Sequence, residues 1–382
     1  MKTPRTSRLP RFYTHPIGSL PRPKAVLDLL ARRQEMDPEH FRSAMDDAVR
    51  FAIRLQEIAG LDVVSDGEWR RTQYIDEFLD RIGGFEPCRR FEHAGEVKYT
   101  RVLVRRVAPR APVFAADARF LAAATDRLAK FALPSPFLIA IRYWQADYSR
   151  GAYPTYQHLM QHLAGILASE AQALVEAGID IVQIDDPALT YFCDRSLMAG
   201  EGTHDERLRR HWRPETQIPE AIDSINQVIQ GLAAETHLHC CHSVYKRRSD
   251  VRGDYQPLLP YLQALQADRV NLEFAYHGTG GLSDLKLVPA HLAVGMGVVD
   301  VRGETPQSVE AIAALASAGA EIIAPERIAL NPDCGFAPDS AEPPTIDEAF
   351  EKLKRLREAA ALVRNRLASR GPSAPIGFLS EP

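Results

Sequence analysis

The sequence predicts an α/β fold, a (β/α)8 TIM barrel with an inserted β-hairpin region and an N-terminal extension. The first observation is a module at 55–69, 172–188, 314–335 and, more loosely, 262–276, in which a helical stretch ends at Ala-Gly or a near equivalent and a short β-branched run follows. Such a run after a helix end is typical of a buried strand. The second observation is the alternation itself, since strands alternating with helices form parallel βα units. The third is the length of 382 residues, which suits one large barrel with insertions or two average domains.

The remaining segments are interpreted relative to this module. Residues 155–178 repeat apolar side chains at three- and four-residue spacing, which predicts an amphipathic barrel helix. Residues 84–135 contain the alternating run "VKYTRVLVRRV", which predicts a strand or hairpin inserted in the barrel. Residues 246–258 are polar and predict a loop, and residues 371–382, rich in Pro, Ser and Gly, predict a loose tail. We therefore expect a single TIM-barrel domain over 1–382, with 84–135 as the insertion.

The composition limits which binding partners and which cellular compartment we expect for this protein. The formal net charge is −4, so neither a nucleic-acid footprint nor a polybasic membrane anchor is expected. No apolar run approaches the ~18–20 residues of a membrane span, and no secretory signal is expected after the basic start. The five cysteines are an odd and sparse set, which argues against a disulfide framework. We expect a cytoplasmic protein with reduced thiols; the oligomeric state stays open.

Polar residues gather where the predicted strands end, and in a TIM barrel the carboxyl ends of the strands carry the catalytic groups. These ends are Asp66-Gly67-Glu68, Asp185-Asp186, His239-Cys240-Cys241, Glu273 and Asp333-Cys334. The densest is the stretch "HLHCCHS" at 237–243. Side chains of a strand alternate between its faces, so His239 and Cys241 share one face and Cys240 points the other way.

Two further residues are candidate partners for this pair in a metal site. Cys334 lies in the turn-prone "NPDCG", and Glu273 is a lone acid in an apolar strand, where an unpaired carboxylate is costly. One imidazole, two thiolates and a carboxylate suit Zn²⁺. Alternatively, the cysteines are small buried hydrophobes and Glu273 belongs to an ordinary salt bridge. The residues alone leave both interpretations open.

Beyond these patterns, the chain resembles the C-terminal catalytic barrel of cobalamin-independent methionine synthase and its single-barrel relatives. The similar segments occur in the same order as in that family. They are "HPIGSLPRP" (15–23), "GLDVVSDGEWRR" (60–71), "VQIDDPAL" (182–189), "HLHCCHS" (237–243), "VNLEFA" (270–275), "VGMGVVDVRGETPQSVEAI" (294–312) and "NPDCG" (331–335).

This resemblance implies roles for named residues. His239, Cys241, Glu273 and Cys334 would be the zinc ligands. Gly18 and Ser19 would bind the carboxylate of an amino-acid thiol. Glu68 and Asp185, as the catalytic acidic pair, would hold its ammonium, and two adjacent carboxylates do attract a cation. The plainer alternatives are a bridge from Glu68 to Arg70 or Arg71, and a helix cap by Asp185.

The implied reaction is methyl transfer to the thiol of homocysteine, which makes methionine. Zinc would lower the pKa of a bound thiol, which is ~8.5 when free, so that the substrate is a thiolate at neutral pH. The methyl donor would be a methylfolate or a methylcorrinoid protein. Arg302 stands where the family has a histidine, and because arginine is a poor general acid a donor that needs no protonation gains weight. Trp144, beside Tyr143, is a candidate donor platform and substrate-binding residue; packing of these aromatic side chains within the barrel is the equal alternative.

Three other functions compete with this one. A zinc-dependent alkyl transfer to another thiol, as in an epoxide–coenzyme M transferase, would call for basic residues where Ser19, Glu68 and Asp185 stand. A porphyrinogen decarboxylase on a related barrel would need no zinc. A catalytically silent zinc protein that binds a corrinoid or methyl-carrying partner would hold zinc without turnover.

Overall fold

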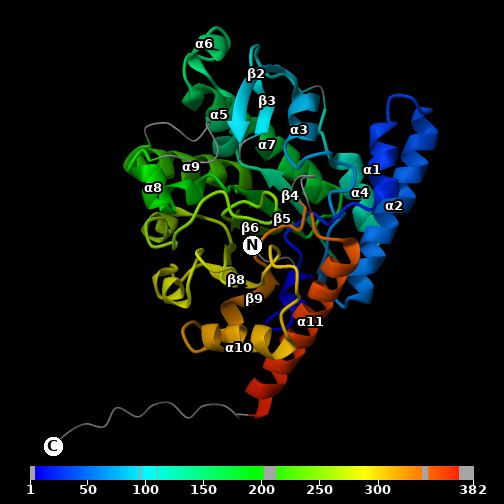
Figure 1. The fold of residues 1–382 in the computed structure, drawn as a ribbon, viewed down its shortest axis with the longest axis vertical. Coiled ribbons are helices and arrows are strands. Elements are labelled where there is room, and N and C mark those ends of the chain that lie inside the picture. The colour runs from blue at the N-terminus through cyan, green and yellow to red at the C-terminus, as the bar shows by residue number, and fades with distance from the viewer. Residues whose placement is uncertain (1–4, 94–95, 110, 202–211, 338–342, 370–382) are drawn as a thin grey trace, which may run out of the picture.

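The computed structural model describes residues 5–93, 96–109, 111–201, 212–337 and 343–369 (Figure 1). The expected tail at 371–382 lies outside them. At the centre is a curled sheet of parallel strands in the order β1-β4-β5-β6-β7-β8-β9. Its strands are β1 (Val63–Val64), β4 (Leu128–Pro134), β5 (Ile181–Asp185), β6 (Glu235–Cys240), β7 (Arg269–Glu273), β8 (Ala293–Val299) and β9 (Ile328–Pro332). Parallel strands joined through helices confirm the α/β fold.

An extended N-terminal segment lies between the two edges of this sheet. Thr14 forms a parallel bridge with Leu330 of β9, and the His15 N–H donates to the Leu330 carbonyl at 3.1 Å. On its other side, the Thr14 carbonyl accepts from the N–H groups of Asp62 and Val63, both at 3.1 Å. The predicted N-terminal extension is thus hydrogen-bonded to β1 and β9, and it leads directly into residues 16–19.

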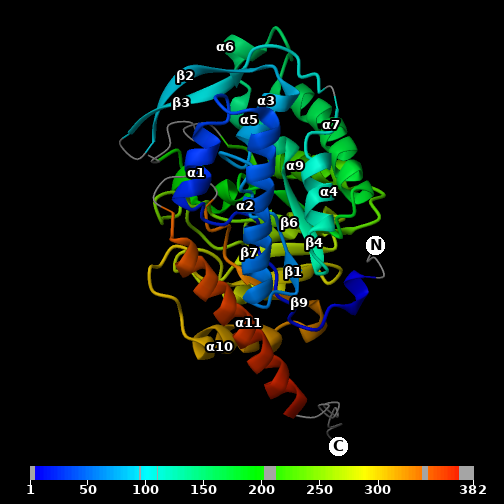
Figure 2. The same cartoon turned by 90° about the vertical axis from the view of Figure 1, so that its right-hand side faces the viewer.

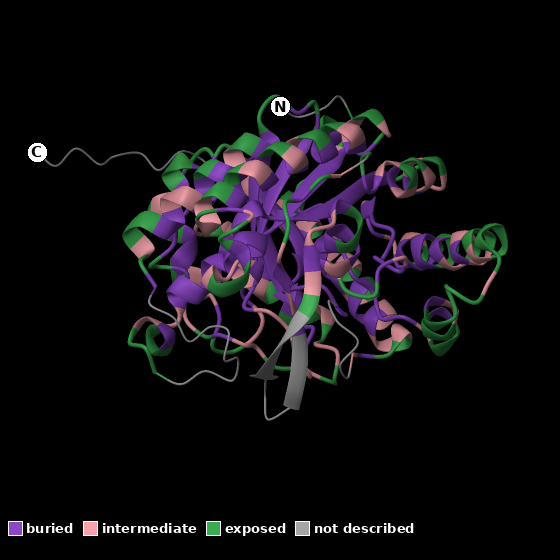
Figure 3. Ribbon diagram, turned by 90° about the horizontal axis from the view of Figure 1, so that it is seen from above, coloured by how far each residue is buried: buried purple, intermediate pink, exposed green. Residues whose placement is uncertain are grey.

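Helices surround the sheet, so its strands are the most buried part of the molecule (Figures 2 and 3). They are α1 (Lys24–Ala31), α2 (Pro38–Ile58), α3 (Asp76–Ile82), α4 (Ala115–Ala123), α5 (Pro136–Tyr143), α6 (Ala146–Ser149), α7 (Tyr156–Glu176), α8 (Arg195–Met198), α9 (Pro214–Ile229), α10 (Val309–Ala320) and α11 (Ile346–Ser369). The short 3-10 turns are η1 (Thr6–Arg8), η2 (Leu189–Cys193), η4 (Leu259–Ala264), η5 (Leu282–Leu287) and η6 (Pro325–Arg327). No helix in the described ranges is long and apolar enough to cross a membrane.

Local sequence signals account for several of these helices. The α2 helix begins at Pro38 after Asp37, whose carboxylate accepts from two N–H groups of the first turn. In α7 the buried positions include Leu159, Leu163 and Leu174, which lie on one face of the helix. This confirms the helix predicted at 155–178.

The predicted hairpin is present as a separate antiparallel pair, β2 (Phe85–His93) and β3 (Glu96–Leu103). The expected insertion at 84–135 extended too far, however. Its last part is β4, which pairs in parallel with β1 and β5 inside the main sheet. All seven residues of β4 are buried. Its third residue, Lys130, is charged and interrupts the otherwise apolar run, so the strand was not predicted. That residues 1–382 form one domain stays a prediction.

Candidate active site and metal centre

A cavity of 340 Å³ opens at the carboxyl ends of the parallel strands. Residues from widely separated parts of the chain line it, because the carboxyl ends of several strands meet there. They include Ser19, Glu68, Asp185, His239, Cys241 and Cys334. The cavity therefore collects side chains from four of the five strand ends that the sequence singled out.

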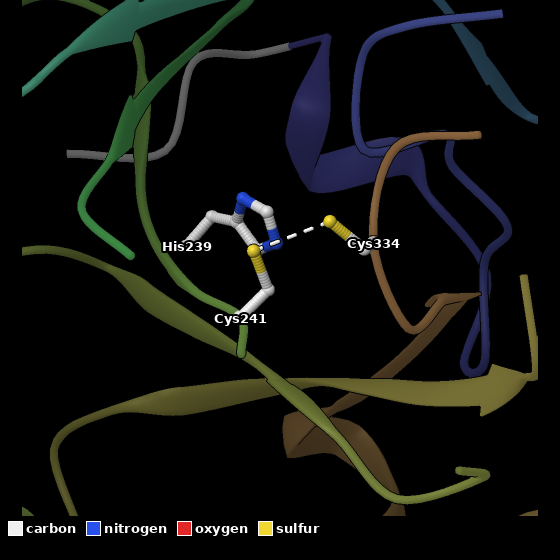
Figure 4. Close-up of side chains that lie close together, drawn as sticks. All are labelled: His239, Cys241 and Cys334. Carbon is white, nitrogen blue, oxygen red and sulfur yellow. Dashed lines mark hydrogen bonds between the residues drawn. The ribbon is translucent and has the colours of Figure 1, made fainter. Parts of the chain in front are cut away.

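Three donor side chains that line this cavity lie close together (Figure 4). One ligand atom from each of His239, Cys241 and Cys334 lies within 4.8 Å of the others, and the two sulfurs are 3.2 Å apart. Strand alternation sends Cys240 elsewhere: its side chain is fully buried in the apolar core. The stretch 237–243 thus supplies two donors, and β9 leads to the third.

The chemistry of these donors fits a metal ion. The Nε2 atom of His239 is buried and makes no hydrogen bond. A buried imidazole nitrogen without a partner is costly unless something binds it. An imidazole and two thiols converging in a buried site form a donor set that suits zinc.

Asp185 fixes the orientation of the histidine. Its Oδ1 atom lies 2.9 Å from Nδ1 of His239. A carboxylate accepts only, so Nδ1 donates to Asp185, and Nε2 is the nitrogen that a metal would bind once its proton is lost. Gln183 supports this arrangement, because its amide donates to Asp185 Oδ1 at 2.7 Å and to the Ile17 carbonyl at 3.1 Å. Gln183 was not among the predicted site residues, although a polar residue inside a buried strand was a signal.

The three donors also shift one another's pKa. The hydrogen bond from Cys334 and the neighbouring His239 lower the pKa of Cys241 to about 5, although burial opposes this. The same hydrogen bond, together with burial, raises the pKa of Cys334. Burial disfavours the charged His239, but Cys241 and Asp185 outweigh burial and raise the pKa of His239 to about 10. The cluster thus favours one thiolate before any cation enters.

Glu273 lies outside this group of three donors. Its Oε1 atom accepts from Arg302 Nη2 at 2.9 Å and from the His242 N–H at 3.0 Å, while Oε2 is buried without a hydrogen bond. Burial opposes its ionisation, but Arg302 and His242 outweigh burial and lower the pKa of Glu273 to about 2. The predicted fourth ligand is therefore ionised: Oε1 is hydrogen-bonded, and Oε2 lies 3.6 Å from Nδ1 of His242.

Two glycines allow the predicted substrate loop to pack tightly. A Cβ atom on Gly18 would lie 2.4 Å from Glu68 Oε1, and one on Gly335 would lie 2.3 Å from Ser19 Oγ. Ser19 is also hydrogen-bonded to the residues after Gly335, since its hydroxyl accepts from the Ala337 N–H at 3.3 Å. The structure thus places Gly18, Ser19 and Glu68 side by side, next to the segment that carries Cys334.

Glu68 is held in a strained and buried position. Its φ is +57°, directly after Gly67 at +65°, and a left-handed backbone is uncommon for glutamate. Burial raises the pKa of Glu68 to about 7; Arg71, 3.9 Å away, opposes the rise and Asp185 adds to it. The alternative partner, Arg70, pairs with Asp46 and Asp117 instead.

The capping role considered for Asp185 belongs to its neighbour. Asp186 Oδ1 accepts from the N–H groups of Ala188 and Leu189 at 3.1 and 3.3 Å. The helix-cap alternative is therefore removed for Asp185.

Trp144 does not line the cavity. It follows α5, and its indole N–H donates to the Tyr153 carbonyl at 2.9 Å. The preceding Tyr143 and Arg142 line the cavity instead, together with Tyr74. The packing of the last turn of α5 determines which side chain faces the cavity. The segment "IRYW" contains no pattern that predicts this orientation.

This architecture defines a class: an α/β protein with a candidate metal centre of one imidazole and two thiols at the carboxyl ends of its parallel strands. The chain belongs to the cobalamin-independent methionine synthase family, since residues 12–362 match the family described as "Cobalamin-independent synthase, Catalytic domain". The resemblance predicted from the sequence is thereby confirmed, and the family is one of methyltransferases.

Individual relatives agree with this assignment. The methionine synthase of Saccharolobus solfataricus is 29% identical over 372 residues, which cover 96% of this chain and 99% of that protein. Its counterpart in Sulfurisphaera tokodaii is 29% identical over 368 residues, with coverage of 95% and 96%. A B12-independent methionine synthase from Shewanella sp. W3-18-1, solved with selenomethionine, superposes with a TM-score of 0.77 at 25% identity, covering 94% of this chain and 100% of that one.

Proposed function

We propose that this protein is a zinc-dependent S-methyltransferase that transfers a methyl group to the thiol of homocysteine and so makes methionine. The observation that carries the proposal is the convergence of His239, Cys241 and Cys334 within one cavity that Glu68 and Asp185 also line. Zinc, when bound to these three residues, would favour the thiolate form of the substrate, whose thiol otherwise has a pKa of ~8.5.

The other cavity residues suit the amino-acid end of homocysteine. Glu68 and Asp185 present two carboxylates for its ammonium, and the backbone and hydroxyl at Gly18 and Ser19 suit its carboxylate. The Shewanella relative was solved with selenomethionine, an analogue of the expected product. Enclosure in a buried cavity strengthens each of these contacts by excluding water.

The metal would keep a place open for the substrate. A catalytic zinc site has three protein ligands and a fourth position for water or substrate. His239, Cys241 and Cys334 supply three, and Glu273 Oε2 is the candidate for the fourth. Arg302 donates a hydrogen bond to the other oxygen, Oε1, of Glu273. This supports the proposal that Glu273 leaves the metal when the thiol of homocysteine binds to it.

Arg302 also bears on the methyl donor. Its guanidinium is buried and ion-paired with Glu273, and an arginine in such a pair does not release a proton at working pH. The arrangement therefore favours a donor whose leaving group needs no protonation, such as a methylcorrinoid protein, over a methylfolate.

We also propose that the sheet is a complete (β/α)8 barrel within a single domain, with residues 12–15 as its eighth strand. The hydrogen bonds of Tyr13 and His15 to β9 and of Thr14 to β1 support this closure. Closure matters for function because the same segment carries the chain into the loop at Gly18 and Ser19.

Homocysteine is expected to add one sulfur to the metal. The zinc-loaded protein should show two sulfur neighbours, from Cys241 and Cys334, and a third after homocysteine is added. Zinc-edge X-ray absorption measures this directly. Homoserine, which has a hydroxyl in place of the thiol, is the control and should add none. A spectrum that homocysteine leaves unchanged would rule it out as the acceptor.

The Asp185→Asn variant is expected to bind zinc about 10- to 100-fold more weakly, because the neutral amide is a poorer partner for Nδ1 of His239. Competition with a chromophoric chelator measures the affinity. Asp180→Asn is the matched control: Asp180 directly precedes β5, at its opposite end, where it accepts from the Ala129 N–H at 2.9 Å. Equal zinc affinity in the two variants would contradict the role of Asp185.

A further inference from the structure

One cationic side chain of the cavity, Arg142, forms no ion pair with the described residues. Arg142, near the end of α5, lines the cavity, and its Nε and Nη2 atoms donate to the Tyr191 hydroxyl at 3.2 and 2.6 Å. In the described part of the chain no carboxylate lies within 4 Å of this guanidinium, and Nη1 donates to no protein group. By contrast Arg101, another arginine of the same cavity, is ion-paired with Asp76 and Asp80.

The surroundings of Arg142 hold the charge without neutralising it. An arginine keeps its proton at every working pH, and the neutral Tyr191 hydroxyl accepts its hydrogen bonds without bringing a negative charge. Arg142 is half-buried, and removing part of a guanidinium from water is costly when no anion accompanies it. Arginine presents its N–H groups as a planar fork that matches a carboxylate or a phosphate. The site thus suits an anion that the described residues do not supply.

The position of Arg142 indicates which substrate brings that anion. The homocysteine carboxylate is assigned to Gly18 and Ser19, which leaves Arg142 to the other substrate. The Tyr143 ring lies 5.9 Å from the Phe85 ring of β2, so this end of the cavity borders the hairpin. The cavity therefore has an acceptor end at Ser19 and Glu68 and a separate cationic end beside the hairpin.

We propose that Arg142 binds an anionic oxygen group, a carboxylate or a phosphate, of the methyl donor. This inference rests on the proposed function and names the chemistry that selects the donor. A methylfolate would bring a glutamate carboxylate, and a methylcorrinoid would bring the phosphate of its nucleotide loop. Both offer the same charged oxygens to the guanidinium.

Two pairs of probes test the proposal by calorimetry on the zinc-loaded chain, without turnover. One pair is methylcobalamin and methylcobinamide, which lacks the phosphate-bearing nucleotide loop. The other is 5-methyltetrahydrofolate and a 5-methyltetrahydropterin without the glutamate. The wild-type protein should prefer the charged member of one pair by about 10-fold or more. The pair that shows the preference identifies the phosphate or the carboxylate as the source.

In Arg142→Met this preference should fall to about one, while homocysteine affinity and zinc content stay at wild-type values. Arg142→Lys keeps the positive charge but lacks the planar pair of N–H donors, so it should keep part of the preference. This variant also tests the proposal if Arg142→Met fails to fold. Arg81→Met removes an arginine that is ion-paired with Glu77 outside the cavity, and should keep the full preference.

Two results would overturn the proposal: a wild-type protein with no preference in either pair, or a full preference in both Arg142 variants. The proposed function is judged separately, by methylation of homocysteine. If the protein prefers the charged probe but methylates no thiol, the anion site at Arg142 is supported and the proposed methylation of homocysteine is refuted.

Discussion

Cys241→Ser and Cys334→Ser are each expected to abolish stoichiometric zinc and methyl transfer while leaving a folded protein. Loss of a residue that merely orients a ligand weakens metal binding about 10- to 100-fold, so loss of a ligand itself should exceed 100-fold. A serine hydroxyl is also a poor substitute for a thiolate, because it stays protonated at neutral pH. Zinc per chain by atomic emission, with circular dichroism for the fold, measures both parts.

Cys240→Ala is the matched control for these two variants. Cys240 is adjacent to Cys241 in sequence, yet its side chain lies in the apolar core. This variant should lose some stability through the small cavity it leaves, but it should keep one zinc per chain. One zinc per chain in both serine variants would refute the assignment of Cys241 and Cys334 as ligands.

Glu68→Gln is expected to abolish the pH dependence of methionine binding. Methionine is the useful probe because it carries the ammonium and no titrating thiol. The pKa of Glu68 is about 7, so about a tenth of the carboxyl is ionised at pH 6 and about nine tenths at pH 8. Binding to the wild type should therefore weaken about tenfold from pH 8 to pH 6, whereas the glutamine variant should bind weakly and equally at both.

Stability should change in the opposite direction. The Glu68 carboxyl ionises near 4.3 in the unfolded chain but near 7 in the folded protein, so the wild type loses stability as the pH rises through that interval. Glutamine has no charge to desolvate. The melting temperature of Glu68→Gln should accordingly exceed that of the wild type by more at pH 8 than at pH 5.

A buried glutamate outside the cavity provides the control. Glu170 accepts from the N–H groups of Val113 and Phe114, and Glu170→Gln should leave methionine binding and its pH dependence at wild-type values. If Glu68→Gln keeps the tenfold change, another group governs the binding of the ammonium.

The fold class and the positions of the strand ends could be predicted because both follow from local pattern. Each helix–glycine–strand module has its own signal, and strand alternation alone separates His239 and Cys241 from Cys240. The β4 strand lacked such a module and contains Lys130, whose charge made an otherwise apolar run look unlike a core strand.

What the sequence could not give depends on contacts between distant segments. Nothing near Gln183 indicates that it joins Asp185 to the Ile17 carbonyl. Arg142 and Trp144 are two residues apart, and only the packing of α5 decides that the arginine faces the cavity. The ion pair of Arg302 with Glu273 likewise needed the strand order, since β7 and the segment after β8 had to be neighbours.

The bridge between Thr14 and Leu330 has a consequence for the order of folding. It joins positions near opposite ends of the described chain. Contacts of such long sequence separation have the largest entropic cost of loop closure. Arg364 of α11 reinforces the bridge by donating to the Arg11 and Phe12 carbonyls at 2.8 and 2.9 Å.

The loop at Ser19 and the segment that carries Cys334 pack on each other only after this meeting of the ends. Local βα units can form earlier, as each strand and helix emerges. The chain is therefore expected to complete most of its hydrophobic core before it possesses a site that can bind either zinc or substrate.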